Sequence, residues 1–348
     1  MAITRKAAML VLSVAALGVF VSSEAQAYNY STCGGNPIKW NRGWTNLYIS
    51  TTSMPIGGVW DNGLQSAMWH WNNVKGSSFL FYVGRDTDGT HSNTNGVSEV
   101  YWDPTLSGTT LAVTSTRYHC YWQNGYQFGI DETDLGFNSN YSWTSGAYNY
   151  ATPTGAPFSF EAVAMHELGH VMGLDHDDRW MATLNSFYPH SGPLGSTREW
   201  DPFGDDRLGA RALYGDGTTE VDIAGSVLKR TGAGTSNLVS SPAWAARGSN
   251  TTMEFTFLNQ STSTRTFDIG FYLSANDVIS TGDTLLGTSY GASGTAGFTG
   301  TFSRSLYIPT WIAPGTYYLG FIVDPLNTLG ENNEGNNTQR MPRTITIY

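Results

Sequence analysis

The sequence predicts an α+β domain followed by an all-β sandwich, and three observations support this division. Upstream of Gly215, short β-type segments alternate with stretches whose apolar residues recur at helical spacing. Downstream of about Leu238, short alternating strands and turns follow one another without a helical period, which is typical of a β-sandwich. Charged residues form 13% of the 348-residue chain and aromatic residues 14%, a mixture that suits β-rich extracellular folds.

The N-terminal residues have the features of a secretory signal peptide. Arg5 and Lys6 precede a nearly unbroken apolar run over residues 7–21, and Ala25-Gln26-Ala27 offers a small-x-small cleavage site. The apolar run is short for a membrane anchor. We therefore expect residues 1–27 to be removed and the mature protein to be secreted without a membrane span. Because the formal net charge is −10, we expect no nucleic-acid binding through a basic surface.

Residues 28–215 are predicted to form the first domain. Trp60, Leu64, Met68 and Trp71 recur at helical spacing, so this helix is expected to turn an apolar stripe toward the core. The β-type segments of the domain are residues 46–50, 79–83, 97–102, 110–115 and 129–138.

The stretch from His166 to His176 carries the strongest chemical signal in the chain. Residues four apart on a helix share one face, so His166 and His170 can present two nitrogens to one metal ion. Gly173 tolerates positive φ, so the helix can end there and the chain can bring in His176 as the third ligand. Three protein ligands with a fourth position left to water are typical of a catalytic zinc site. Ordinary solvated histidines are the alternative, but the complete HExxHxxGxxH pattern strongly favours zinc.

Zinc at these residues would predict a mechanism for peptide-bond hydrolysis. The ion would activate a bound water and polarise the scissile carbonyl, and it would be the main stabiliser of the oxyanion. Glu167 points about 100° around the helix from His166, so we expect it to serve as general base without being a ligand. It would then pass the proton to the leaving amine, and no acyl-enzyme would form.

The zinc motif and three further segments together resemble the metzincin metalloproteases, most closely the matrixins. The similarity covers about residues 38–214 and rests on Trp71-Asn72-Asn73-Val74, residues 134–138, residues 166–176 and residues 205–215. It implies a metzincin catalytic domain of the α+β class, in which a twisted mixed β-sheet packs against the active-site helix. It also implies that an extended peptide substrate pairs with an edge strand beside the cleft.

The same resemblance implies a methionine turn beneath the zinc ion, for which Met181 is the candidate. Met181 follows His176 by five residues, which is closer than is usual in matrixins. Asp177 stands where matrixins usually carry serine. Tyr188-Pro189 is a candidate for the wall of the substrate pocket.

Cys33 and Cys120 are the two cysteines of the chain, and an exported protein with one pair predicts a disulfide between them. Closing so long a loop is worth on the order of 4 kcal/mol in the chain-entropy model. The alternative is that Cys33 is a removable zinc ligand, because residues 33–37 faintly resemble the cysteine switch of matrixin propeptides. That alternative leaves Cys120 unpaired.

The turn over residues 86–91 is a candidate for a structural Ca²⁺ or a second zinc. Alternating aspartates precede a glycine there, and His91 follows. A polar turn between strands is the alternative, because the acidic residue that completes a calcium loop is missing. His70, His119 and His190 have no partners at matching spacing and are expected to be ordinary surface or core residues.

The C-terminal part is predicted to begin with a Gly-, Thr- and Ser-rich linker at residues 216–234, followed by a sandwich over residues 235–348. Residues 271–277, 323–325 and 331–337 resemble the bacterial CARDB domain, an immunoglobulin-like module of cell-surface proteins. This resemblance implies a cell-surface or matrix ligand. Three acidic residues are candidate calcium ligands by analogy with other extracellular sandwiches, although polar turns explain them equally well: Asp283, Glu331 and Glu334.

Two functions from different classes follow from these features. The first is a secreted zinc endopeptidase that acts on protein or peptide substrates and carries an accessory sandwich. The second is a cell-surface adhesion or glycan-binding protein that uses an inactive metalloprotease scaffold. A decayed enzyme usually loses its general base or a ligand, and here all four residues are present, which favours the enzyme: His166, Glu167, His170 and His176.

Overall fold

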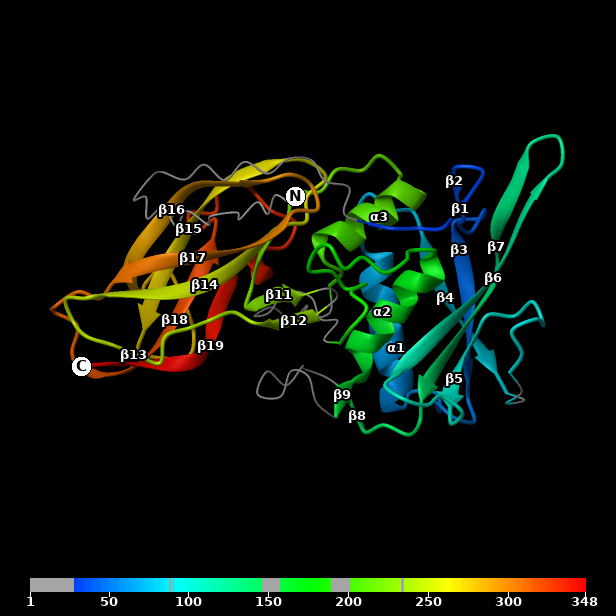
Figure 1. Cartoon of the computed structure of the whole chain (residues 1–348), viewed down its shortest axis with the longest axis horizontal. Helices are drawn as coiled ribbons and strands as arrows, with labels where there is room; N and C mark the ends of the chain where they lie inside the picture. The colour runs from blue at the N-terminus through cyan, green and yellow to red at the C-terminus, as the bar shows by residue number, and fades with distance from the viewer. Residues whose placement is uncertain (1–27, 88, 90, 146–156, 189–200, 233–234) are drawn as a thin grey trace, which may run out of the picture.

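The computed structural model describes residues 28–87, 89, 91–145, 157–188, 201–232 and 235–348. The predicted signal peptide, His190, Pro189 and two residues of the 86–91 turn lie outside the described residues. Among the helices that are described, none is long and apolar enough to cross a membrane. Figure 1 shows two bodies beside each other: the first combines helices with a sheet, and the second is built almost entirely of strands.

The first body is built on a five-stranded mixed sheet of order β4-β3-β5-β7-β6. The first three neighbouring pairs are parallel, and β6 runs antiparallel to β7 at the edge. Its strands are β3 (Trp44–Ser50), β4 (Leu80–Asp86), β5 (Glu99–Asp103), β6 (Ala112–Trp122) and β7 (Tyr126–Asn138). Two short pairs accompany the sheet, namely β1 (Thr32–Cys33) with β2 (Asn36–Pro37) and β8 (Trp143–Thr144) with β9 (Phe158–Ser159).

Helices α1 (Val59–Asn72) and α2 (Phe160–Met172) pack against each other and against this sheet. Leu64, Met68 and Trp71 of α1 are buried, so the predicted apolar stripe does face the core. The indole Nε1 of Trp71 donates a hydrogen bond of 2.9 Å to the backbone oxygen of Met165 in α2. This contact helps to hold α2 in place against the apolar side of α1. Helix α3 (Gly204–Tyr214) follows at the end of this body.

Strand β6 is much longer than the predicted segment, which ended at Ser115. Its pairing with β7 continues from Thr116 opposite Thr133 to Trp122 opposite Tyr126. Most side chains in this outer part are exposed, so neither face shows the apolar alternation that marks a half-buried strand. The result is a long hairpin that projects beyond the rest of the sheet (Figure 1).

The second body is a β-sandwich. Its sheets have the orders β10-β14-β17 and β13-β19-β18-β15-β16, and the pair β11-β12 lies beside them. The strands are β10 (Ile223–Ser226), β11 (Leu228–Gly232), β12 (Thr235–Leu238), β13 (Trp244–Ala245), β14 (Asn250–Asn259), β15 (Arg265–Ser274), β16 (Thr284–Gly294), β17 (Thr299–Tyr307), β18 (Gly315–Val323) and β19 (Thr338–Ile347), with a 3₁₀ turn at Glu334–Asn336. Phenylalanines 255, 257, 271 and 321 fill the space between the sheets.

The stretch 216–234, predicted to be a linker, contains the two short strands β10 and β11. Ile223, Ala224, Val227 and Leu228 are buried, and β10 pairs with β14 of the sandwich. The many Gly, Thr and Ser residues concealed these short strands from pattern analysis, and the partner of β10 lies thirty or more residues further along the chain. The domain boundaries themselves stay a prediction.

The two bodies meet through a small apolar cluster and a buried ionic cluster. Met181 and Phe203 of the first body pack with Ala224, Leu228 and Leu258 of the second. Beside them lies the junction cluster, which we define as Asp201, Arg207, Glu220, Asp222 and Asn336, all less than 5% exposed. The guanidinium of Arg207 donates to Glu220 at 2.9 Å and to Asp222 at 3.3 Å, and Asn336 donates to Asp222 at 2.9 Å.

Candidate active site

Helix α2 carries the first two histidines of the site, and it ends at Gly173 as the sequence predicts. The hydroxyl of Ser159 accepts a hydrogen bond from the backbone nitrogen of Ala162 at 3.3 Å and caps the start of the helix. Gly173 ends it with a φ of 103°, in the left-handed region that glycine adopts without strain. A Cβ at Gly173 would also lie 2.9 Å from the backbone oxygen of Ile38. The chain can therefore reverse directly after His170.

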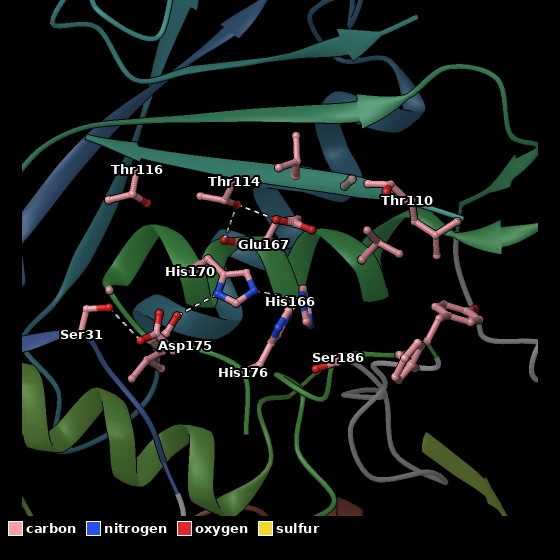
Figure 2. Close-up of a pocket in the computed structure, with 18 of the residues that line it drawn as sticks. Ser31, Thr110, Thr114, Thr116, His166, Glu167, His170, Asp175, His176 and Ser186 are labelled. Carbon is pink, nitrogen blue, oxygen red and sulfur yellow. Dashed lines mark hydrogen bonds between the residues drawn. The ribbon is translucent and has the colours of Figure 1, made fainter. Parts of the chain in front are cut away.

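The reversal brings the three predicted histidines together (Figure 2). The Nε2 atom of His166 lies 3.1 Å from the Nε2 atoms of both His170 and His176. The ring nitrogens of the three residues form a group within 4.8 Å of one another that is able to hold a metal ion. His166 is buried, whereas His176 is exposed at the mouth of the site.

The protonation of two of these rings follows from their hydrogen bonds. The Nδ1 atom of His166 lies 2.9 Å from the backbone oxygen of Thr183, and that of His170 lies 2.8 Å from the oxygen of Leu174. A carbonyl oxygen only accepts, so both Nδ1 atoms carry the proton and both Nε2 atoms present lone pairs. Burial lowers the pKa of His170, which disfavours a second proton on its ring.

Two lone pairs that face each other at 3.1 Å need a cation between them. In a tetrahedral site with Zn–N distances of about 2.05 Å, neighbouring nitrogens are about 3.3 Å apart, close to this spacing. Backbone carbonyls that hold the opposite ring nitrogens are also the usual outer support of metal-binding histidines. The donor set and its geometry therefore fit a zinc ion.

Glu167 lies next to the histidines but points elsewhere, toward strand β6 (Figure 2). The hydroxyl of Thr114 donates to its Oε2 atom at 2.6 Å. Glu167 is 5% exposed, and burial raises the pKa of its carboxyl to about 7, while the hydrogen bond from Thr114 acts against that shift. Sequence analysis missed Thr114, because an edge strand of threonines and serines has no motif that would single it out.

The turn that contains Met181 supports the histidine helix from one side. Thr183, two residues after Met181, supplies the carbonyl oxygen for His166. The carboxylate of Asp206 in α3 accepts from the backbone nitrogens of Thr183 at 2.7 Å and Leu184 at 3.2 Å. The Leu184 side chain fills the place where a Cβ of Gly169 would stand, at 2.6 Å. Met181 itself is buried, and its role at the metal stays a prediction.

Thr114, Glu167 and the three histidines line a cleft of about 780 Å³. Strand β6 and the residues before it form one wall, from Thr109 to Tyr118. Ser31 and Asp175, joined by a hydrogen bond of 3.0 Å, lie on the opposite side. Tyr188, the candidate wall residue, lines the cleft, and its hydroxyl accepts from the backbone nitrogen of Ser159 at 3.2 Å.

The two cysteines form a disulfide, so Cys33 is not available as a removable metal ligand. The predicted pairing of Cys33 with Cys120 is confirmed. Two of the histidines expected to be ordinary surface or core residues have carboxylate partners. His70 pairs with Asp201 in the interior at 2.7 Å, and His119 pairs with Asp131 on the hairpin at 2.9 Å.

A second group of metal-ligand type appears among the described residues at Asp86, His91 and Glu99, whose ligand atoms lie within 4.8 Å of one another. The Oε2 atom of Glu99 also accepts from the backbone nitrogen of Ser92, as the polar-turn alternative requires. Both interpretations of this turn therefore remain. In the sandwich, Asp283 accepts from Ser280, and the carboxylates of Glu331 and Glu334 both accept from Asn337, which fits polar turns.

Comparison with known proteins agrees with the sequence resemblance. A family model described as matrixin matches residues 124–215. This range includes the three histidines of the candidate site and Glu167. Metalloendoproteinase 1 of Glycine max is 32% identical over 91 residues, which cover 26% of this chain and 28% of that protein. Matrix metalloproteinase-25 of Homo sapiens is 34% identical over 82 residues, which cover 24% of this chain and 13% of that protein. The chain thus spans less than a third of the length of these relatives.

Solved structures similar to the chain include the CARDB domain of a Pyrococcus furiosus protein in complex with di-metal ions. That structure shows 15% identity and a TM-score of 0.27, covering 37% of this chain and 90% of its own. A domain of a putative cell surface protein from Methanosarcina acetivorans shows 19% identity and a TM-score of 0.24, covering 31% and 85%. Residues 124–215 of this chain, which carry the histidine group, are thus similar to the matrixins.

Proposed function

We propose that this protein is a secreted zinc-dependent endopeptidase. The observation that carries the proposal is the pair of Nε2 lone pairs of His166 and His170 facing each other at 3.1 Å, with the Glu167 carboxylate next to them in an open cleft. Secretion rests on the predicted signal peptide and fits the Cys33–Cys120 disulfide, because such bonds persist in oxidising compartments.

His166, His170 and His176 would hold one catalytic zinc ion. When bound, zinc lowers the pKa of a water toward ~7 and polarises a carbonyl oxygen. The backbone oxygens of Thr183 and Leu174 would keep two of the rings in the required tautomer. These contacts fix the ligands before the ion arrives, so little rearrangement is needed on binding.

Glu167 would serve as the general base and then as the general acid. It would take a proton from the attacking water and deliver it to the nitrogen of the leaving amine. A carboxyl with a pKa of about 7 can accept and release a proton near neutral pH with little cost in either direction. The hydroxyl of Thr114 donates to Oε2 and so would hold the carboxylate toward the cleft.

The substrate would bind as an extended peptide along β6. Within the described part of the chain this strand is the last in its sheet, and it pairs there with β7 on one side only. Its outer edge can therefore add a peptide strand through main-chain hydrogen bonds, directly beside Glu167. A peptide bound there would lie across the histidine group with its scissile bond near the metal.

The proposal is tested with purified protein and a fluorogenic peptide. Cleavage should be lost on treatment with a chelator, should return on addition of zinc, and should coincide with about one zinc per chain in metal analysis. Cleavage that survives complete removal of metal would contradict the proposal, and a zinc-loaded protein that cleaves no protein or peptide would favour the adhesion alternative.

A further inference from the structure

We propose that the outer part of the β6–β7 hairpin is an extension of the substrate cleft, which binds a stretch of the protein substrate remote from the scissile bond. We call residues 116–126 the hairpin extension. The inference rests on the proposed endopeptidase function and specifies the kind of substrate: a protein with a long extended segment around its cleavage site.

The cleft wall continues along β6 into the hairpin extension, and the register shift between Arg117 and Tyr118 places its extra residue in β7 rather than in β6. Thr114, which contacts the Glu167 carboxylate, lines the cleft, and Thr116 and Tyr118 continue the lining at alternate positions along the same strand. β6 is the last strand of its sheet over its whole described length. A peptide that pairs with β6 near Glu167 can therefore continue along the same edge toward the tip.

The hairpin extension exposes four aromatic side chains in a short length of chain. Tyr118 and Tyr121 are each 52% exposed, Tyr126 is 46% exposed and Trp122 is 70% exposed. Trp122 and Tyr126 face each other across the hairpin, with ring centroids 5.1 Å apart. Clustered exposed aromatic rings are typical of interaction surfaces, because each ring buries a large area at a low cost in conformational entropy.

Several contacts hold the hairpin in place against the first body. The disulfide joins Cys120 in the middle of the extension to Cys33 of β1. The ring of Tyr126 lies over Gly34, where a Cβ would come within 2.2 Å of it, so only glycine fits beneath this ring. A surface fixed in this way loses little freedom when it binds a partner.

An extended polypeptide fits this surface better than a glycan does. The free strand edge offers alternating main-chain donors and acceptors that a peptide matches, and the aromatic rings offer apolar contacts for its side chains. The charged groups of the extension are already paired, Arg117 with Glu132 and His119 with Asp131. We therefore expect uncharged or apolar residues in the bound segment. At about 3.3 Å per residue, the eight steps from Thr114 to Trp122 span ~26 Å, the length of about eight substrate residues.

The experiment compares three fluorogenic peptides that share the same central sequence. One is short, the second is extended at its N-terminal end and the third at its C-terminal end. Each extension has about eight uncharged residues, both apolar and polar. For the wild-type protein, kcat/KM should rise about tenfold for one extended peptide and not for the other, as expected when an aromatic contact is gained on one side. In Trp122→Ser the ratio of kcat/KM for that extended peptide over the short peptide should fall toward one. Trp311→Ser is the matched control, because Trp311 in the sandwich is also 70% exposed.

Binding of the same peptides to Glu167→Ala, measured by fluorescence anisotropy, separates docking from turnover. The extended peptide should bind more tightly than the short one, and the added Trp122→Ser change should remove the difference. Equal kcat/KM and equal affinity for all three peptides, or a length advantage that Trp122→Ser leaves intact, would overturn the inference. A binding advantage without cleavage of any peptide would support docking on the hairpin and contradict the proposed function instead.

Discussion

The histidine cleft and the junction cluster both place several ionisable groups within hydrogen-bond distance, but they differ in how the charges are satisfied. In the cleft, the Nε2 atoms of His166 and His170 face each other with lone pairs on both sides. At the junction, burial alone would lower the pKa of Arg207, yet the carboxylates of Glu220 and Asp222 raise it by more. The guanidinium there is a cation that the chain itself supplies.

This difference separates a ligand site from a structural contact. A group of acceptors that points inward without a proton has a place for an external cation, whereas a group with its own arginine is complete. The cleft is also open to solvent at His176, while Arg207 is 3% exposed. The two clusters should therefore respond in opposite ways to metal and to mutation, and the following predictions test that contrast.

The largest effect is expected for removal of a ligand, in His170→Ala. The variant should lose zinc, and with it both proteolysis and the part of the stability that metal binding contributes. Metal analysis after dialysis, combined with a fluorogenic peptide assay, measures both losses. A variant that retains one tightly bound zinc per chain would show that His170 is not a ligand.

Glu167→Ala should separate chemistry from metal binding. Because the carboxylate points toward Thr114 and not into the histidine group, zinc should stay bound. Proteolysis should fall by roughly 10²–10⁴, the range for the loss of a general base. Thr114→Val, which removes only the hydroxyl that orients the carboxylate, is the graded control and should cost less. Wild-type turnover in Glu167→Ala would show that the activity belongs to another site.

At the junction, Arg207→Met should lower the free energy of unfolding by about 3–5 kcal/mol, because it removes the buried guanidinium that offsets the charges of Glu220 and Asp222. Zinc should not restore this loss. The control is Arg340→Met: Arg340 is exposed and lies over the ring of Tyr318, so its loss should cost about 1 kcal/mol or less. Urea unfolding with and without zinc distinguishes the two cases, and equal destabilisation by both substitutions would mean that the junction cluster is not a coupled unit.

Both the zinc motif and the two fold classes could be predicted from the sequence, whereas the junction and the hairpin could not. His166, Glu167, His170 and His176 lie within eleven residues, so their geometry follows from one helix and one glycine turn. Arg207, by contrast, meets Asn336 through Asp222, and no local pattern relates such distant positions. The long β6 was missed for a related reason, since its stability comes from pairing with β7 rather than from apolar alternation.

Removing the disulfide tests a covalent contact near the cleft, in addition to the metal-ligand and ionic contacts above. In Cys33→Ser/Cys120→Ser, the loop of 87 residues is no longer closed, and the free energy of unfolding should fall by about 2–4 kcal/mol. Denaturant unfolding measures the change, and mass spectrometry of a non-reduced digest confirms the bond in the wild type. Two free thiols in protein purified without reductant would contradict the pairing.

The smallest effect is expected at a third buried cluster of ionisable groups, which is formed by Asp134, Glu132 and Glu99. Asp134 is 2% exposed, and burial raises the pKa of its carboxyl to about 7, with Glu132 and Glu99 adding to the shift. A folded-state pKa above the ordinary 3.8 means that Asp134 contributes most stability below about pH 4 and loses this contribution as the pH rises through 7. Asp134→Asn keeps an oxygen that can accept from the backbone nitrogen of Glu99, as Oδ1 does at 3.0 Å, and removes the titration.

The variant should therefore match the wild type near pH 4 and melt several degrees higher at pH 8. Melting curves of both proteins across this range, each with and without Ca²⁺, provide the measurement. If added Ca²⁺ raises the wild-type melting temperature at pH 8 and leaves the variant unchanged, these carboxylates take up a cation as the histidines are proposed to do. If Ca²⁺ has no effect and the pH dependence persists, the cluster is structural but less completely satisfied than the one around Arg207. A wild type that gains stability from pH 4 to pH 8 relative to Asp134→Asn would contradict the raised pKa.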